Sequence, residues 1–197
     1  MDIYEKVKDY SDLLNTNLMF FKGELSETFY YGSKWGEGED QNDHAIVSTK
    51  NLIELTEKYR IFTVNGQSSY SDKYTKQRSY LTFYMEEYLF EKIYNRLMND
   101  SRIWVIFNGP VSDVSDVSEY DFKEIGSDDS ETKRIVLTLD CGEPYSIWNS
   151  KYCYRYEDNF SYDKVNNILK KLIYCTIIRK DFSEDPTADS VLLEHII

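Results

Sequence analysis

Apolar and polar side chains alternate along the run Tyr80–Met85. Leu81, Phe83 and Met85 face one way, and the residues between them face the other. A period of two is typical of a β-strand with distinct faces. This pattern predicts a strand over residues 80–84.

A helix is expected directly after this strand, because apolar residues recur every four positions at Met85, Leu89, Ile93 and Leu97. That spacing places them on one helical face and predicts a helix over 86–98. The run Arg102–Phe107 then carries the most strand-like composition of the chain. Strand, helix and strand together predict a central βαβ unit over 80–107. Its crossover should be right-handed if the two strands are parallel and share one sheet.

Another helix and another strand are predicted just before this unit. Asn51 and Glu54 fit a capping box, which predicts a helix over 51–59. A β-branched and aromatic strand over 61–64 follows and ends at a turn signal, Asn65-Gly66. The polar run from Gln67 to Gln77 is expected to form a loop. Strands 61–64 and 80–84 could pair as a hairpin across it.

These patterns predict a single α+β domain over residues 1–197, with a mixed β-sheet of about five strands covered by helices. Strand 102–107 is expected at the centre of the sheet because it is apolar on both faces. Acidic segments at 32–46 and 111–132 are expected to be loops. The predicted strands are 61–64, 80–84, 102–107, 134–139 and 173–178, and the predicted helices are 3–14, 51–59, 86–98, 162–171 and 188–195.

The formal net charge of −12 argues against a nucleic-acid-binding protein, which should show a basic face. It also argues against docking on anionic membranes. The charge is explained by solubility alone, or by an acidic surface for a basic partner, or by mimicry of a nucleic acid. The three cysteines form no close pair, and the sequence has no signal-like apolar core and no long apolar run. These features predict an intracellular, cytoplasmic protein.

One polar cluster is a candidate binding site. If strands 61–64 and 80–84 are neighbours, then Asn65, Gln67, Gln77 and Arg78 converge at one edge of the sheet. Their amide and guanidinium groups could hold a carboxylate, a phosphate or a peptide backbone. The alternative is that they satisfy backbone groups of the loop, as most polar side chains do.

Asp140 is a further candidate because it lies at the end of strand 134–139, beside Cys141. A cysteine nucleophile needs a base, and the histidines are His44 and His195. A buried, unreactive cysteine is the alternative. No standard metal-ligand spacing and no glycine-rich phosphate loop occurs in the sequence. No metal and no cofactor are therefore predicted.

A resemblance covers residues 51–80. Asn51-Leu, Leu55-Thr, Phe62-Thr and Gln67, followed by Gln77-Arg-Ser-Tyr, resemble a pattern found in uncharacterised proteins of bacteria and large DNA viruses. This sequence departs from that pattern, with Gly66 where serine would stand and Ser68 where proline would stand. The resemblance implies that 51–107 is the structural centre, and it carries no activity.

The sequence therefore predicts a non-catalytic protein-binding or structural protein. The chain has 18 tyrosines, and tyrosine is enriched at protein interfaces. A viral origin would fit a virion component or a host-directed binder. The alternative is a small enzyme that acts on a polar or anionic substrate near Gln67 and Arg78.

Overall fold

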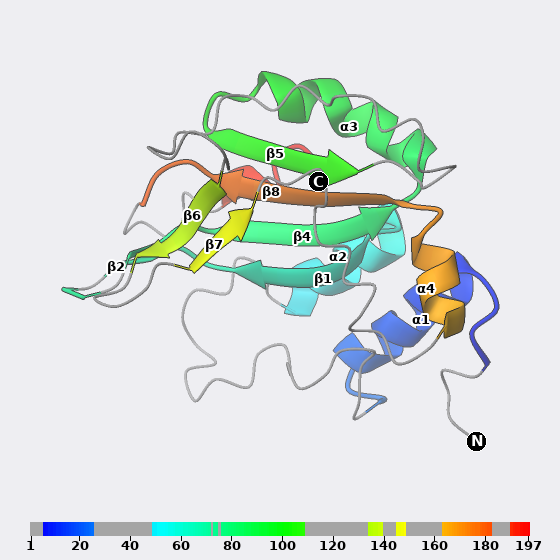
Figure 1. Ribbon diagram of the computed structural model, residues 1–197. Helices are drawn as coiled ribbons and strands as arrows, with labels where there is room; N and C mark the ends of the chain where they lie inside the picture. The colour runs from blue at the N-terminus through cyan, green and yellow to red at the C-terminus, as the bar shows by residue number, and fades with distance from the viewer. Residues whose placement is uncertain are drawn as a thin grey trace.

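The computed structural model describes residues 6–25, 49–71, 73–74, 76–108, 134–139, 145–148, 163–182 and 190–197. It combines helices with antiparallel sheets, so the predicted α+β class is confirmed (Figure 1). In chain order the elements are α1 (Tyr10–Phe21), α2 (Thr49–Tyr59), β1 (Phe62–Gln67), β2 (Tyr70–Ser71), β3 (Lys76–Gln77), β4 (Tyr80–Met85), α3 (Glu87–Asn99), β5 (Ile103–Asn108), β6 (Arg134–Leu139), β7 (Tyr145–Trp148), α4 (Asp163–Leu169) and β8 (Ile173–Arg179).

The main sheet has four strands in the order β1-β4-β8-β5, and every pairing in it is antiparallel. The predicted hairpin between β1 and β4 is present. Because β4 and β5 both run antiparallel to β8, they are parallel to each other, and α3 connects them. They are not neighbours, however, since β8 lies between them. The predicted βαβ unit is therefore present, but the expectation of a mixed sheet was wrong, because every pair of neighbouring strands is antiparallel.

The predicted central position of strand 102–107 was also wrong. Among the described strands β5 lies at an edge of the main sheet, and β4 and β8 occupy the middle. The run is apolar on both faces for a different reason. Ile103 and Phe107 join a core cluster on one side, while Ile106, on the other side, is only 2% exposed. A layer covers each face of the sheet, so even its edge strand is buried on both sides.

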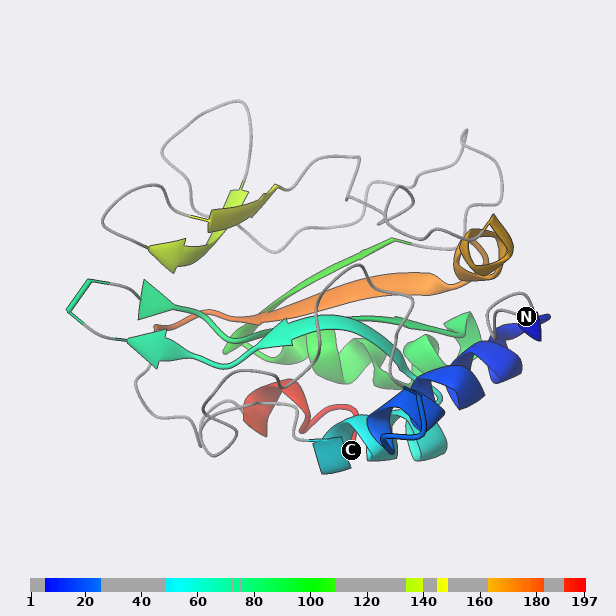
Figure 2. The same cartoon turned by 90° about the horizontal axis from the view of Figure 1, so that it is seen from below.

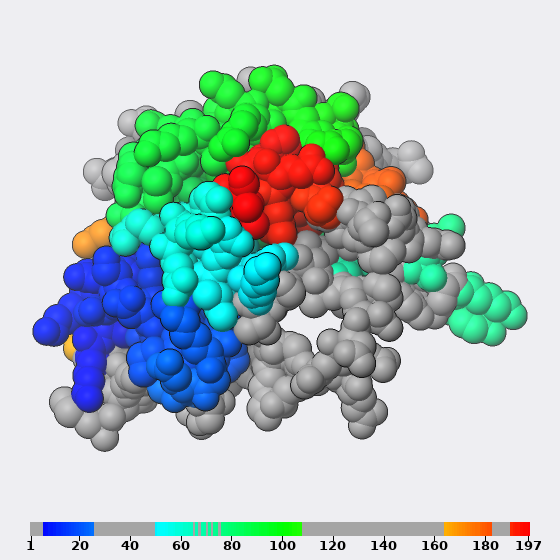
Figure 3. Space-filling model, turned by 180° about the vertical axis from the view of Figure 1, so that it is seen from behind, coloured from blue at the N-terminus to red at the C-terminus, as the bar shows by residue number. Residues whose placement is uncertain are grey.

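One face of the main sheet is covered by α2, α3 and the C-terminal segment 190–197. Figure 3 shows this segment lying between α2 and α3. Alternate residues of β4 and β8 point to this side, and burying each large apolar side chain contributes roughly 1.5–3 kcal/mol. The cluster includes Leu52, Leu55, Leu81, Phe83, Phe90, Ile93, Leu97, Cys175, Ile177, Leu192 and Ile196.

The opposite face packs against α1 and α4 at one end of the strands. Phe62, Tyr84 and Tyr174 are cross-strand neighbours there. They form a second cluster with side chains of both helices, among them Tyr10, Leu13, Leu14, Val165 and Leu169. Strands β6 and β7 lie on this side of the main sheet, away from α3 (Figure 2).

A second sheet has the order β2-β3-β6-β7. The predicted strand 134–139 is present as β6, but it pairs with β3 and β7 and does not join the main sheet. The predicted loop from Gln67 to Gln77 contains a short hairpin in which β2 pairs with β3. Its backbone forms ladder bonds although its side chains are polar, so hydrophobic periodicity did not reveal it.

Asn51 lies inside α2, which begins at Thr49, so the predicted capping box at Asn51 was wrong. Two other predicted helices differ more in their bounds. The first was expected over 3–14 but begins at Tyr10, because Asp9 caps it by accepting a hydrogen bond from the Asp12 backbone N–H at 3.0 Å. It continues through Phe21. The helix expected at 188–195 is a short 3₁₀ turn at 190–192. The acidic segments 32–46 and 111–132 lie outside the described residues.

Candidate functional site

The strand register places two of the predicted site residues on one face of the main sheet. Asn65 lies opposite Thr82, and Gln67 lies opposite Tyr80. Thr82 in turn lies opposite Thr176 of β8. Cross-strand partners share a face, so Asn65, Thr82 and Thr176 form a row across three strands. We call these three residues the polar row.

An irregularity in β1 sets this arrangement. The register shifts between Thr63, which lies opposite Phe83, and Asn65, which lies opposite Thr82. Val64 is therefore the extra residue of a β-bulge, and bulges re-aim the residues that follow them. Without the bulge, Asn65 would lie opposite Leu81, on the helix-covered face. The bulge thus brings Asn65 to the face that carries Thr82.

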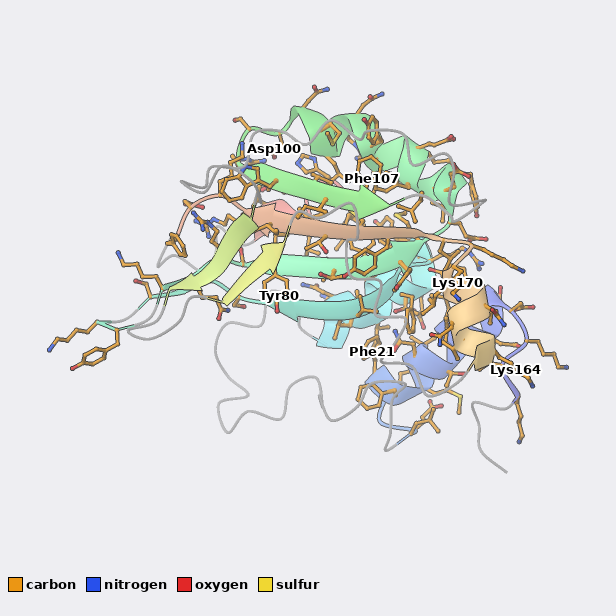
Figure 4. The ribbon with its side chains drawn as sticks, viewed as in Figure 1. Phe21, Tyr80, Asp100, Phe107, Lys164 and Lys170 are labelled. Carbon is orange, nitrogen blue, oxygen red and sulfur yellow. The ribbon has the colours of Figure 1, made fainter. Side chains whose placement is uncertain are left out.

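The two threonines of the polar row are buried and bonded to each other. The Thr82 and Thr176 hydroxyl oxygens lie 3.0 Å apart, and the two residues are 3% and 2% exposed. One hydroxyl donates and the other accepts. Tyr80, which lies near the middle of Figure 4, is also buried and continues the hydroxyl-bearing face. This face therefore offers short polar groups in an otherwise apolar interior.

Arg78 is held by the protein itself. Its Nε donates a hydrogen bond to the Lys180 carbonyl oxygen at 2.8 Å. Its guanidinium carbon lies 3.8 Å from the ring centroid of Phe182 and 5.1 Å from that of Trp104. Burial lowers the pKa of Arg78, while the nearby Asp181 carboxylate raises it. The side chain thus ties the β3–β4 link to the chain that follows β8.

Gln77 also bonds to backbone. The residue is buried, and its Nε2 donates to the Ser68 carbonyl oxygen at 2.8 Å. Gln77 and Arg78 therefore satisfy backbone carbonyls of two different segments, the alternative that the sequence left open. The structure brings Asn65 and Gln67 together on one face through the register. Asp140 and Cys141 lie outside the described residues.

A charged cluster joins the end of α3 to the C-terminal segment, and sequence reasoning missed it. Asp100, labelled in Figure 4 beside the start of β5, accepts a hydrogen bond from Arg102 Nη2 at 2.6 Å. His195 Nε2 lies 2.7 Å from the same carboxylate. Arg102 Nη2 also donates to Glu194 at 2.7 Å. We call Asp100, Arg102, Glu194 and His195 the C-terminal latch.

The electrostatics of the C-terminal latch favour its ionised form. The hydrogen bonds from Arg102 hold the pKa of Asp100 well below its usual value, and His195 adds to this effect. The same carboxylate and Glu194 raise the pKa of Arg102. His195 had been considered as a base for Cys141, but it pairs with Asp100. The sequence shows that these residues are acids and bases, but it does not show that they pair, because the partners lie far apart in the chain.

Four large hydrophobic side chains of the described residues are exposed, and three of them are tyrosines. Tyr74 is 61% exposed, Tyr88 is 51% and Tyr94 is 36%, and the fourth is Ile197. Tyr88 and Tyr94 belong to α3. Tyr94 packs edge-on against Phe90 and Phe107, with ring centroids 5.9 and 5.7 Å away. These contacts hold one side of the Tyr94 ring, while another part of the ring faces solvent.

No protein-family model matches this chain, and no curated protein matches its sequence. Within the described ranges, no helix is long and apolar enough to cross a bilayer.

Proposed function

We propose that this protein acts without catalysis, by binding another protein. The observation that carries the proposal is the exposure of Tyr88 and Tyr94 on α3. Most large apolar side chains of the described residues are buried. A tyrosine ring that remains in water can bury its apolar faces against a partner while its hydroxyl stays hydrogen-bonded.

The surroundings of these tyrosines suit an interface. Lys92 Nζ lies 5.4 Å from the Tyr88 ring centroid, and the Tyr88 hydroxyl donates to Glu86 at 3.4 Å. Tyr94 rests on buried rings, so little conformational entropy remains to be lost on binding. Tyrosines of this kind often contribute a large share of the binding energy. The net charge of −12 would steer a basic partner towards the acidic segments 32–46 and 111–132.

A virion component and a host-directed binder are the two settings that we propose for such a protein. Both act through contact with another protein and need no cofactor. The weak resemblance to proteins of bacteria and large DNA viruses is compatible with either. Identifying the partner distinguishes them, since a capsid protein indicates the first and a host protein indicates the second.

Capture of the tagged protein from its native cell tests this proposal. We expect a stoichiometric partner at low salt that is reduced at high salt, because salt screens the charges that steer association. The double variant Tyr88→Ala/Tyr94→Ala should lose the partner. Asn95→Ala, an exposed change on the same helix, should keep it and serves as the matched control. Far-UV circular dichroism establishes that each variant is folded.

The competing proposal is a small enzyme or metabolite-binding protein, and the polar row is the observation that favours it. A polar or anionic substrate would bind near Gln67 and Arg78. Native mass spectrometry of the purified protein tests this. A monomer without any protein partner but with a bound metabolite would overturn the protein-binding proposal in favour of this one.

A further inference from the structure

The hairpin formed by β2 and β3 projects from the body of the protein. Its strands pair Tyr70 with Gln77 and Ser71 with Lys76. Figures 1 and 2 show the hairpin extending beyond the ends of the neighbouring strands. A partner could therefore reach its tip without first touching the main sheet or the helices.

The base of this hairpin is firmly held. β3 pairs on its other side with β6. Gln77 donates to the Ser68 carbonyl, and Arg78 bonds the Lys180 carbonyl and stacks on Phe182. An isolated two-stranded hairpin is marginal in water, so these contacts fix its direction. The tip is thus presented at a defined angle.

The tip carries an aromatic ring together with lysines. Tyr74 is the most exposed large hydrophobic side chain among the described residues, at 61%. Lys73 Nζ lies 5.1 Å from its ring centroid, and Lys73 and Lys76 are both exposed. An ammonium over a ring face restrains both side chains. Tyr74, Lys73 and Lys76 form what we call the hairpin tip.

The charge of this segment is opposite to that of the chain. Residues 71–78 hold three cationic side chains, Lys73, Lys76 and Arg78, against one acidic residue, Asp72, while the chain carries −12 overall. An acidic surface that approaches the protein is repelled by the net negative charge. At close range this acidic surface is attracted to sites where cationic side chains project. The attraction orients the two proteins as they meet.

We propose that the hairpin tip docks on an acidic surface of a partner protein, with Tyr74 buried at the contact and the two lysines paired with carboxylates. This inference rests on the proposed function, because it assumes that the protein acts by protein contact. It adds a second contact surface, separate from α3, and names the charge of the local patch on the partner that this surface meets. A tip of this size covers less than a standard interface of about 1,600 Å², so the contact is weak and transient.

Nucleic acid is the other polyanion that a lysine and tyrosine tip could meet. Affinity for a phosphate backbone rises with the number of phosphates neutralised, and the hairpin tip offers only Lys73 and Lys76. The charge of −12 would oppose a long polyanion along its whole length. A compact acidic patch on a protein avoids this repulsion, which is why we favour it.

Site-specific photocrosslinking in extract of the native cell tests the proposal. The full-length protein would carry Tyr74→p-benzoylphenylalanine, and a second preparation would carry Tyr94→p-benzoylphenylalanine on α3. We expect a discrete protein adduct from position 74, with a crosslinked peptide rich in Asp and Glu. High salt and Lys73→Glu/Lys76→Glu should each reduce its yield at least about tenfold, since like charges then face each other. Lys170→Glu/Lys171→Glu, a pair of exposed changes just after α4, is the matched control and should leave the adduct intact.

The possible outcomes separate this inference from the proposed function. An adduct from position 94 with none from position 74 would keep protein binding and overturn the hairpin proposal. An adduct from position 74 that is abolished by nuclease, or whose crosslinked peptide is not acidic, would also overturn it. If neither position gives an adduct and capture finds no partner, both proposals fail together.

Discussion

The Asp100 carboxylate accepts a hydrogen bond from His195 Nε2 across 2.7 Å, although the two residues are 95 positions apart. Because Arg102 donates to the same carboxylate, one side chain fastens the C-terminal segment to the turn after α3. Leu192 and Ile196 of that segment lie in the main core. Asp100 thus links a surface ion cluster to the packing of the interior.

Asp100→Asn should therefore destabilise the protein. The asparagine loses the negative charge and one acceptor oxygen, and hydrogen bonds to charged groups contribute about 1.5–3 kcal/mol. We expect unfolding in urea to show a loss of about 1–3 kcal/mol. Hydrogen exchange should speed up first in residues 190–197. Glu91→Gln, an exposed change on α3, is the control and should alter stability by less than about 0.5 kcal/mol.

The same residue predicts a dependence of stability on pH. Its pKa is lowered on folding from the usual value of 3.8. The ionised carboxylate therefore stabilises the fold fully above pH 3.8, and this contribution is lost as the pH falls towards the folded-state pKa. The difference in unfolding free energy between wild type and Asp100→Asn should shrink as the pH falls below 3.8. A difference that stays constant down to about pH 2.5 would contradict the assignment.

The hydroxyl pair of the polar row predicts non-additive substitutions. Thr82→Val or Thr176→Val alone leaves the other hydroxyl buried without this partner, which costs about 1–3 kcal/mol. The double variant removes both polar groups and keeps the volume, so it should cost less than the sum of the two. Urea unfolding of the four proteins forms a double-mutant cycle with an expected coupling of about 0.5–1.5 kcal/mol. Strict additivity would show that the pair does not interact.

The contacts of Arg78 predict that replacing it with lysine lowers the stability of the protein. Arg78→Lys keeps the positive charge but loses the Nε hydrogen bond to Lys180 and the planar packing on Phe182. We expect a loss of about 1–2 kcal/mol in thermal or urea unfolding. Arg96→Lys, at an exposed position of α3, should have little effect. Equal effects at the two positions would argue against a structural role for Arg78.

Local patterns predicted the elements well, because each depends on neighbours in sequence. The alternation in Tyr80–Met85 corresponds to β4, and the period of four from Met85 to Leu97 corresponds to α3. The order of strands could not be predicted in this way. An apolar run such as Ile103–Phe107 indicates that a strand is buried on both faces. Edge strands and central strands can both be buried in this way, so the run does not give the position of the strand in the sheet.

The candidate site was predicted only in part for a related reason. The pairing of β1 with β4 was expected, but Asn65-Gly66 lies within β1 and does not form the predicted turn. The bulge at Val64, which places Asn65 and Gln67 on the Thr82 face, was not predicted. The partners of Gln77 and Arg78 are the backbone carbonyls of Ser68 and Lys180, which every residue type possesses. No side-chain pattern marks such partners. The bond between Asp100 and His195 joins distant positions and could not be inferred without a homologous alignment or a fold.

The placement of β8 between β4 and β5 has a consequence for synthesis on the ribosome. Both neighbours are translated before β8, so they leave the exit tunnel without the strand that joins them. Until β8 arrives, their apolar faces and unpaired ladder groups are accessible to other chains. Pairings between distant segments also form slowly. The nascent chain therefore passes through an interval in which its own sheet does not yet protect these groups from aggregation.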